Sequence, residues 1–162
     1  MTHDVREIAN LVIDESRSGG MHVTNLSLNK IIYFLHASYL FEFNRPLVSA
    51  KIEAWDHGPV FREIYHQFKN FERSTITARA RQLDLATGKF FEPEPNLNPS
   101  EDAFLRPLCL ELLKIPVGKL VDMSHVEDGP WYQARYGRGR INPGVEITDA
   151  LILESQDQLS RH

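Results

Sequence analysis

The stretch that follows Thr24 constrains the fold more than any other part of the sequence. Its apolar side chains recur at helical spacing and form one wide face, made by Leu28, Ile31, Ile32, Leu35 and Tyr39. Thr24 is a residue type that caps helix N-termini, and Pro46 ends the pattern because proline has no backbone N–H to donate. The sequence therefore predicts a long helix between these two residues.

Further helical patterns lie on both sides of this segment. We predict helices over residues 4–17, from a cap at Ser100 to Leu113, over 117–123, from Gly129-Pro130 onward, and over 149–158 with Thr148 as the cap. Another helix is predicted to open at Gly58-Pro59, because proline is favoured at the first helical position.

Extended structure is expected in only two places. Residues 51–56 form either a short strand or an extended connector, and residues 76–79 and 89–91 flank Ala86-Thr87-Gly88 as a β-hairpin. Residues 141–144 are predicted to form a turn. The predicted fold is mainly α: a compact helical domain of about five to seven helices with a small β-hairpin in the middle, and one domain over residues 1–162.

Charge and cysteine content exclude several classes of protein. The chain has 18 Lys and Arg against 22 Asp and Glu, whereas a dedicated nucleic-acid binder usually has a basic excess. The one basic cluster, Arg135, Arg138 and Arg140, is interpreted as a solvated loop. No signal peptide and no membrane-spanning run are visible, so the protein is expected in the cytoplasm, with Cys109 as a small buried hydrophobe.

Chemical motifs are missing from the sequence. The seven histidines have no zinc-like spacing, and there is no nucleophile elbow, phosphate loop or dinucleotide fingerprint. We therefore predict no catalytic residue, no metal site and no cofactor. His36, within an otherwise apolar helix, is expected to be a core or boundary histidine with its hydrogen bonds satisfied.

Two segments are unusual for a plain core. Residues 52–60 and 125–132 each place Gly-Pro next to a tryptophan, a histidine and carboxylates. The favoured interpretation is architectural: each tryptophan wedges a loop onto the core while its N–H finds a carbonyl. The alternative is that the two segments form the edges of a recognition groove, because Trp, Tyr and Arg dominate binding hot spots.

Taken in order, these residues resemble the SocA-like, or Panacea, antitoxin domain family, also called phage-associated protein. The resemblance rests on residues 28–35 (Leu-Asn-Lys-Ile-Ile-Tyr-Phe-Leu), Pro46-Leu47, residues 52–60, Tyr65, Phe68-Lys69, Leu120, Ser124-His125 and residues 130–135. Isoleucines before Tyr33 and a histidine at position 57 depart from the common pattern. Residues 75–98 match no part of it.

The resemblance implies an antitoxin that neutralises a toxin encoded by a neighbouring gene through direct, stoichiometric binding, without catalysis. Residues of the family motif, and so of the expected partner-binding region, are Lys30, Tyr33, Glu53, Trp55, Asp56, His57, Gly58, Pro59, Tyr65, His125, Pro130, Trp131 and Arg135. The net charge of −4 suits a basic partner. Membrane and direct nucleic-acid binding are not expected, and a homo-oligomer is left open.

Two alternatives accompany this interpretation. One is a proteolytic adaptor that delivers a toxin to a protease. The other is a small hydrolase in which His57 or His125 works with Glu53, Asp56 or Asp128. A separate hypothesis links the two unusual segments, with Arg135 bracing Glu53 or Asp56 across the fold.

Overall fold

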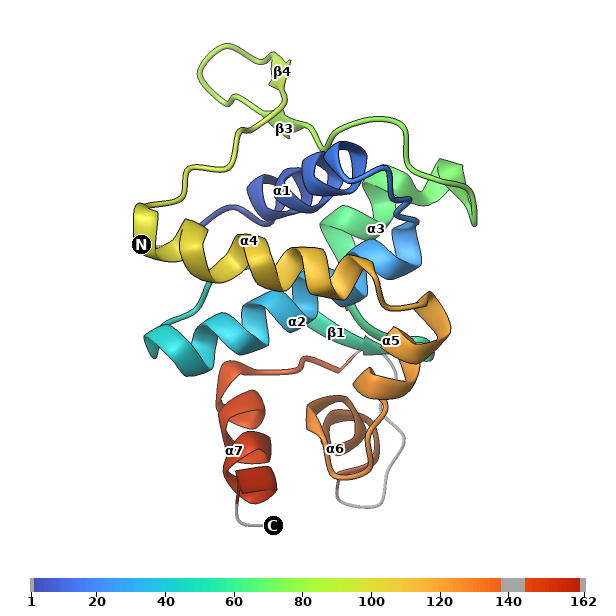
Figure 1. Cartoon of the computed structure of the whole chain (residues 1–162), viewed down its shortest axis with the longest axis vertical. Coiled ribbons are helices and arrows are strands. Elements are labelled where there is room, and N and C mark those ends of the chain that lie inside the picture. The colour runs from blue at the N-terminus through green and yellow to red at the C-terminus, as the bar shows by residue number, and fades with distance from the viewer. Residues whose placement is uncertain (1, 138–144, 161–162) are drawn as a thin grey trace.

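The computed structural model describes residues 2–137 and 145–160, with side chains described up to residue 155, and the mainly helical fold is confirmed (Figure 1). The helices in these residues are α1 Val5–Ser18, α2 Asn25–Phe43, α3 Arg62–Phe68, α4 Pro99–Leu113, α5 Val117–Ser124, α6 Pro130–Tyr136 and α7 Asp149–Ser160, with a 3-10 helix η1 at Lys69–Phe71. The strands are β1 Ile52–Trp55, β2 Gly58–Phe61, β3 Gln82–Leu83 and β4 Phe90–Phe91. The turn predicted over 141–144 lies outside the described residues.

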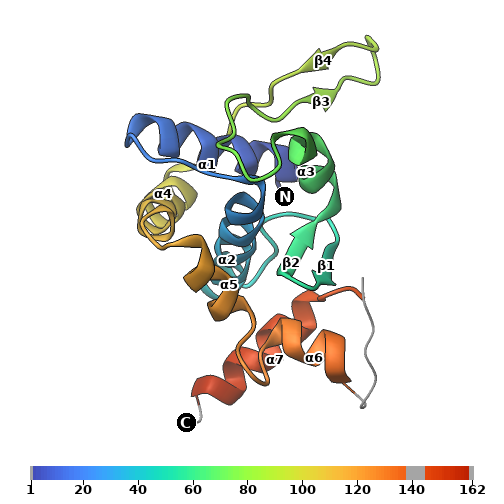
Figure 2. The same cartoon turned by 90° about the vertical axis from the view of Figure 1, so that its right-hand side faces the viewer.

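Helix α2 is the centre of the molecule, as its wide apolar face predicts. It contacts α1, α3, α4, α5, α7 and β2 (Figures 1 and 2). Thr24 caps it as predicted, since its Oγ1 accepts a hydrogen bond of 3.2 Å from Ser27 N. At the other end Asn44 adopts a left-handed conformation, with φ of 53°, that stops the helix before Pro46.

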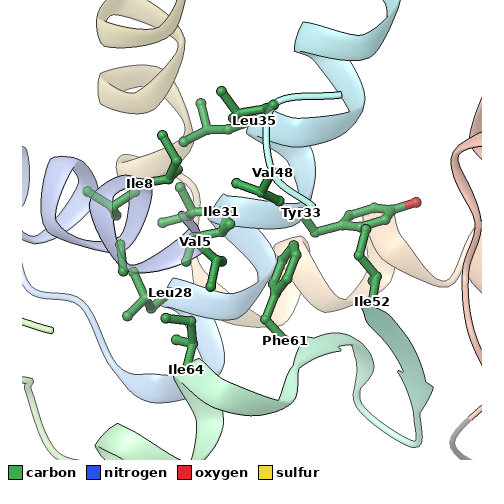
Figure 3. Packing of buried hydrophobic residues seen from close by; sticks show 14 of the residues in the cluster. Val5, Ile8, Leu28, Ile31, Tyr33, Leu35, Val48, Ile52, Phe61 and Ile64 are labelled. Atoms are coloured by element: carbon green, nitrogen blue, oxygen red, sulfur yellow. The ribbon is translucent and has the colours of Figure 1, made fainter. Parts of the chain in front are cut away.

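The core forms where α1, α2, α3 and the β1–β2 hairpin meet. Figure 3 shows Ile8 of α1 and Leu28 and Ile31 of α2 packed near Phe61 and Ile64, and all five are at most 1% exposed. Full burial of such a side chain stabilises a fold by about 1.5–3 kcal/mol. This core fixes the position of the β1–β2 hairpin against α2.

The helix predicted to open at Gly58-Pro59 is present as α3, but it begins at Arg62, and the predicted start is wrong because Gly58 and Pro59 belong to strand β2. β2 pairs antiparallel with β1, with Trp55 opposite Gly58 and Ala54 opposite Pro59. The N–H of Ala54 points away from β2 and donates to the carbonyl of Val145 at 2.8 Å. Position 59 therefore lies in a pair without ladder hydrogen bonds, and its missing N–H costs nothing there.

The β-hairpin in the middle of the chain is confirmed, but its first strand lies later than predicted. Gln82–Leu83 pairs with Phe90–Phe91, and the hairpin projects from the body at the end opposite α6 and α7 (Figures 1 and 2). Ile76 and Ala80, which the sequence placed in or beside the first strand, are buried in the body instead. Their apolar side chains are used by the core, so pairing begins only beyond them.

A single buried amide holds both ends of this hairpin. Asn10 of α1 is fully buried, and its Nδ2 donates to the carbonyls of Ala80 at 3.1 Å and Pro93 at 2.8 Å. Its Oδ1 accepts from the N–H of Ala80 at 2.7 Å. The chain thus leaves and re-enters the body at one point.

Helix α4 begins earlier than predicted. Asn98, rather than Ser100, is the cap, and Pro99 occupies the first helical position. The Oδ1 of Asn98 accepts from the N–H of Glu101 at 2.8 Å, while a Glu101 carboxylate oxygen accepts from the N–H of Asn98 at 3.1 Å. This reciprocal capping box selects Asn98, because it satisfies two otherwise unpaired donors.

Candidate functional site

A groove of about 1080 Å³ lies between the N-terminal half of α2, the turn of the β1–β2 hairpin, α3 and η1. Val117 of α5 and Arg135 of α6 complete its wall. Seven residues of the family motif line it: Lys30, Glu53, Trp55, Asp56, His57, Tyr65 and Arg135. Segments far apart in the sequence are therefore brought together at one concave surface, which we call the motif groove.

One wall of the motif groove is aromatic. The rings of Trp55 and Tyr65 meet edge to face, with centroids 4.8 Å apart and planes at 62°. Both side chains are half-buried. The indole N–H of Trp55 donates to Glu53 at 3.3 Å, and Arg62 donates to the same carboxylate at 3.0 Å. The wall is thus held in place by neighbours in its own hairpin and in α3.

Arg135 connects the two unusual segments of the sequence. Its Nη2 donates to Asp56 Oδ1 at 2.7 Å, and its Nη1 donates to the carbonyl of Ala54 at 3.3 Å. The hypothesis of an arginine brace therefore holds for Asp56, whereas Glu53 pairs with Arg62. Arg135 does not lie in a solvated loop, because it is 6% exposed within α6. The other two arginines of that predicted loop, at 138 and 140, lie outside the described residues.

Trp131 supports the same junction from beneath. Its indole N–H donates to the carbonyl of Trp55 at 2.6 Å, so the architectural interpretation is confirmed for this tryptophan. The ring of His125 packs on it, with centroids 3.9 Å apart, and the guanidinium of Arg135 lies 5.4 Å from its centroid. Trp131 is buried and stabilises the turn of the β1–β2 hairpin through its hydrogen bond to Trp55. Trp55 itself forms part of the groove wall.

Lys30 is the least expected residue of the site, because its side chain is fully buried. Its Nζ donates to the carbonyl of Pro59 at 2.8 Å, and among the described side chains no carboxylate lies within ion-pair distance of it. Burial lowers the pKa of the Lys30 ammonium to about 7. Burial and the nearby charge of Lys30 also lower the pKa of His125.

The remaining motif residues lie behind the groove. Tyr33 is in the core, where burial raises the pKa of its hydroxyl, and Pro130 occupies the first position of α6. Gly58 has φ of +115° and packs directly against Lys30 and Ser124. Pro59 supplies the carbonyl that Lys30 binds. Tyr33, Gly58 and Pro59 are buried, so they support the groove from behind, whereas Pro130 is half-buried outside it.

Two groups outside the groove that could carry chemistry, Cys109 and His36, are buried, and His36 also has its hydrogen bonds satisfied. Burial raises the pKa of the Cys109 thiol to about 12, as expected for a buried hydrophobe. His36 bonds Asp149 at 2.8 Å and accepts from the N–H of Val48 at 3.4 Å, which confirms the prediction of a satisfied core histidine. In the part of the chain that the structure describes, no three His, Cys, Asp or Glu side chains gather as metal ligands.

Sequence reasoning missed several residues of the groove: Leu26, Arg62, Lys69, Arg73 and Val117. Lys69 closes the Phe68-Lys69 pair quoted for the family pattern, so a signal for it existed. The others carry no motif. Only the packing of α3 and α5 beside α2 brings them to this surface.

Comparison with known proteins identifies the family of this chain. The family model "Antitoxin SocA-like, Panacea domain" matches residues 28–132, and the chain belongs to this family. Among curated proteins, it is 31% identical over 150 residues to "Antitoxin SocA" of Caulobacter vibrioides strain NA1000 / CB15N, covering 92% of this chain and 80% of that protein. No solved structure matches. Within the described residues, no helix is both long enough and apolar enough to cross a membrane.

Proposed function

We propose that this protein is the antitoxin of a toxin–antitoxin pair and neutralises its toxin by direct, stoichiometric binding at the motif groove. The observation that carries the proposal is the convergence of motif residues from α2, the β1–β2 turn, α3 and α6 on one concave surface. Trp and Tyr are enriched among the residues that contribute most to binding at protein interfaces.

The contacts of the carboxylates favour binding over hydrolysis. Glu53 accepts hydrogen bonds from Arg62 and Trp55, and Asp56 accepts one from Arg135. A carboxylate that orients or assists a histidine needs a hydrogen bond to it. Among the described contacts of His57 and His125, none is to either carboxylate, so these acids hold the hairpin in place.

The first prediction concerns growth rescue. The neighbouring open reading frame is induced in a bacterial host with this protein, or with a variant that combines Trp55→Ala and Tyr65→Ala. We expect the wild type to restore growth and to co-purify with the neighbour's product. The double variant should lose most of the rescue, because truncating an aromatic hot-spot residue costs about 2 kcal/mol or more in binding.

Leu85→Ala is the matched control, since Leu85 is 89% exposed on the β3–β4 hairpin and lies outside the motif groove. It should rescue growth like the wild type, and circular dichroism must show that all variants are folded. Loss of rescue with Leu85→Ala alone would place the contact on the hairpin and contradict the groove. A harmless neighbour, or rescue without a complex, would contradict neutralisation by binding.

A further inference from the structure

The motif groove has a charge opposite to that of the whole chain. Four Lys or Arg side chains besides the buried Lys30, and three Asp or Glu side chains, line it, whereas the chain has 18 of the first kind and 22 of the second. The groove is therefore a locally cationic region on an acidic protein. A partner selected by this surface differs from the basic partner that net charge alone suggests.

The excess of positive charge lies at one side of the groove. Arg62 pairs with Glu53, and Arg135 pairs with Asp56. Lys69 and Arg73, by contrast, are exposed on and just after η1, and no ion pair to either is found in the described part of the chain. These two cations remain available to a ligand, with Glu72 between them in the sequence.

Apolar side chains lie beside these cations. Trp55 and Tyr65 form the aromatic wall, and Leu26 and Val117 line the groove, with Val117 40% exposed. With a volume of about 1080 Å³, the groove has room for a short peptide segment. Its shape and chemistry suit a polypeptide segment that alternates apolar and negatively charged residues.

We propose that the motif groove binds an acidic segment of the toxin, whose carboxylates pair with Lys69 and Arg73 while its apolar side chains pack on Trp55, Tyr65 and Val117. This inference rests on the proposed function and names the chemistry of the partner's contact segment. A nucleic acid fits less well, because binding a continuous run of phosphates needs several cations, whereas Lys69 and Arg73 are the two that the described part of the groove leaves available.

The direct test needs no toxin. The ¹⁵N-labelled protein is titrated with the peptide acetyl-Glu-Leu-Glu-Phe-Glu-Leu-Glu-amide and followed by NMR. Two control peptides replace either all glutamates by lysine or all apolar residues by serine. We expect saturable shifts at amides of α3, η1 and the β1–β2 turn with the first peptide only. Equal shifts with a control peptide, or shifts spread over the surface, would overturn the inference.

A pair of charge reversals provides the second test, on the purified complex with the neighbour's product. The combination of Lys69→Glu and Arg73→Glu should weaken toxin binding about tenfold or more at low salt and reduce its salt dependence. Lys89→Glu, the same change at an exposed site outside the groove, should bind like the wild type.

The two proposals fail separately. If the wild type rescues growth and forms the complex but the double charge reversal binds equally well, neutralisation stands and the acidic segment is wrong. If the neighbour forms no complex, the neutralisation proposal fails. The peptide titration then decides whether the groove still selects acidic apolar segments.

Discussion

Replacement of Gly58 by alanine is expected to lower the free energy of unfolding by about 2–6 kcal/mol, because two costs add at this position. The backbone of Gly58 has φ of +115°, which an L side chain rarely adopts. A β-carbon there would also lie 2.5 Å from Lys30 Cε and 2.6 Å from Ser124 Oγ. Urea denaturation followed by circular dichroism measures the loss.

Alanine variants of two other glycines distinguish the cost of backbone strain from the cost of the steric clash. Gly88 has φ of +70° with nothing within 4 Å, so Gly88→Ala carries the strain without the clash and should cost about 1 kcal/mol. Gly118 lies in α5 with open space around it, and Gly118→Ala should stabilise by about 0.5–1 kcal/mol. If Gly58→Ala lowers the free energy of unfolding no more than Gly88→Ala does, the close contact between position 58 and Lys30 is contradicted.

Replacement of Lys30 by methionine is expected to stabilise the protein at neutral pH by about 3 kcal/mol, and so to raise its Tm by several degrees. The ammonium is fully buried against a single carbonyl, and burial lowers its pKa from 10.5 to about 7. Methionine has a similar length and no charge to desolvate. The lost hydrogen bond to Pro59 offsets about 1 kcal/mol of the gain.

The pH dependence of this effect has a defined sign. Below pH 7 the ammonium is protonated in both the folded and unfolded states, so the full cost of burying it is present. Between pH 7 and 10.5 only the unfolded state keeps the proton, and the stability of the wild type therefore rises with pH. The advantage of the methionine variant should be largest below pH 7 and shrink toward pH 10.5.

Thermal unfolding of both proteins from pH 6 to pH 10 measures this difference, and titrations shared by the two proteins cancel in it. The exception is His125, whose pKa is lowered by burial and by the charge of Lys30, so its titration differs between the two proteins. Burial raises the pKa of the Tyr33 hydroxyl, so this group stays protonated throughout the window. The exposed replacement Lys89→Met should change stability by no more than about 0.5 kcal/mol at any pH. A methionine variant less stable than the wild type at pH 6 would contradict the burial cost.

The helices could be predicted from the sequence because their patterns are local. Thr24 and Thr148 are caps in the structure as the sequence indicates, and the apolar stripe of α2 marks the centre of the fold. Gly58-Pro59 was misassigned because proline after glycine is equally compatible with a helix start and with a strand pair that needs no N–H. The pairing of β2 with β1, and the packing of that hairpin against α2, decide between them.

The identities of many residues at the site could be predicted from the sequence motif. Their positions relative to one another on the surface could not. The motif named Trp55 and Trp131 together, but their different positions, one in the groove wall and one buried beneath it, follow from the packing of α6 under the β1–β2 turn. The cationic side of the groove could not be predicted, because pairing of Arg62 and Arg135 leaves Lys69 and Arg73 as the available charges only in three dimensions.

The hydrogen bonds of Asn10 at the base of the β3–β4 hairpin make the structure of the body largely independent of changes within the hairpin. Because Asn10 binds the carbonyls of Ala80 and Pro93, and Gln67 binds the N–H and carbonyl of Arg81, the intervening residues close a loop whose ends are held by α1 and α3 as well as by the hairpin's own pairing. The entropy of closing such a loop grows slowly with its length. The protein therefore has a modular position at which a segment can lengthen, shorten or be exchanged during evolution while the groove keeps its shape.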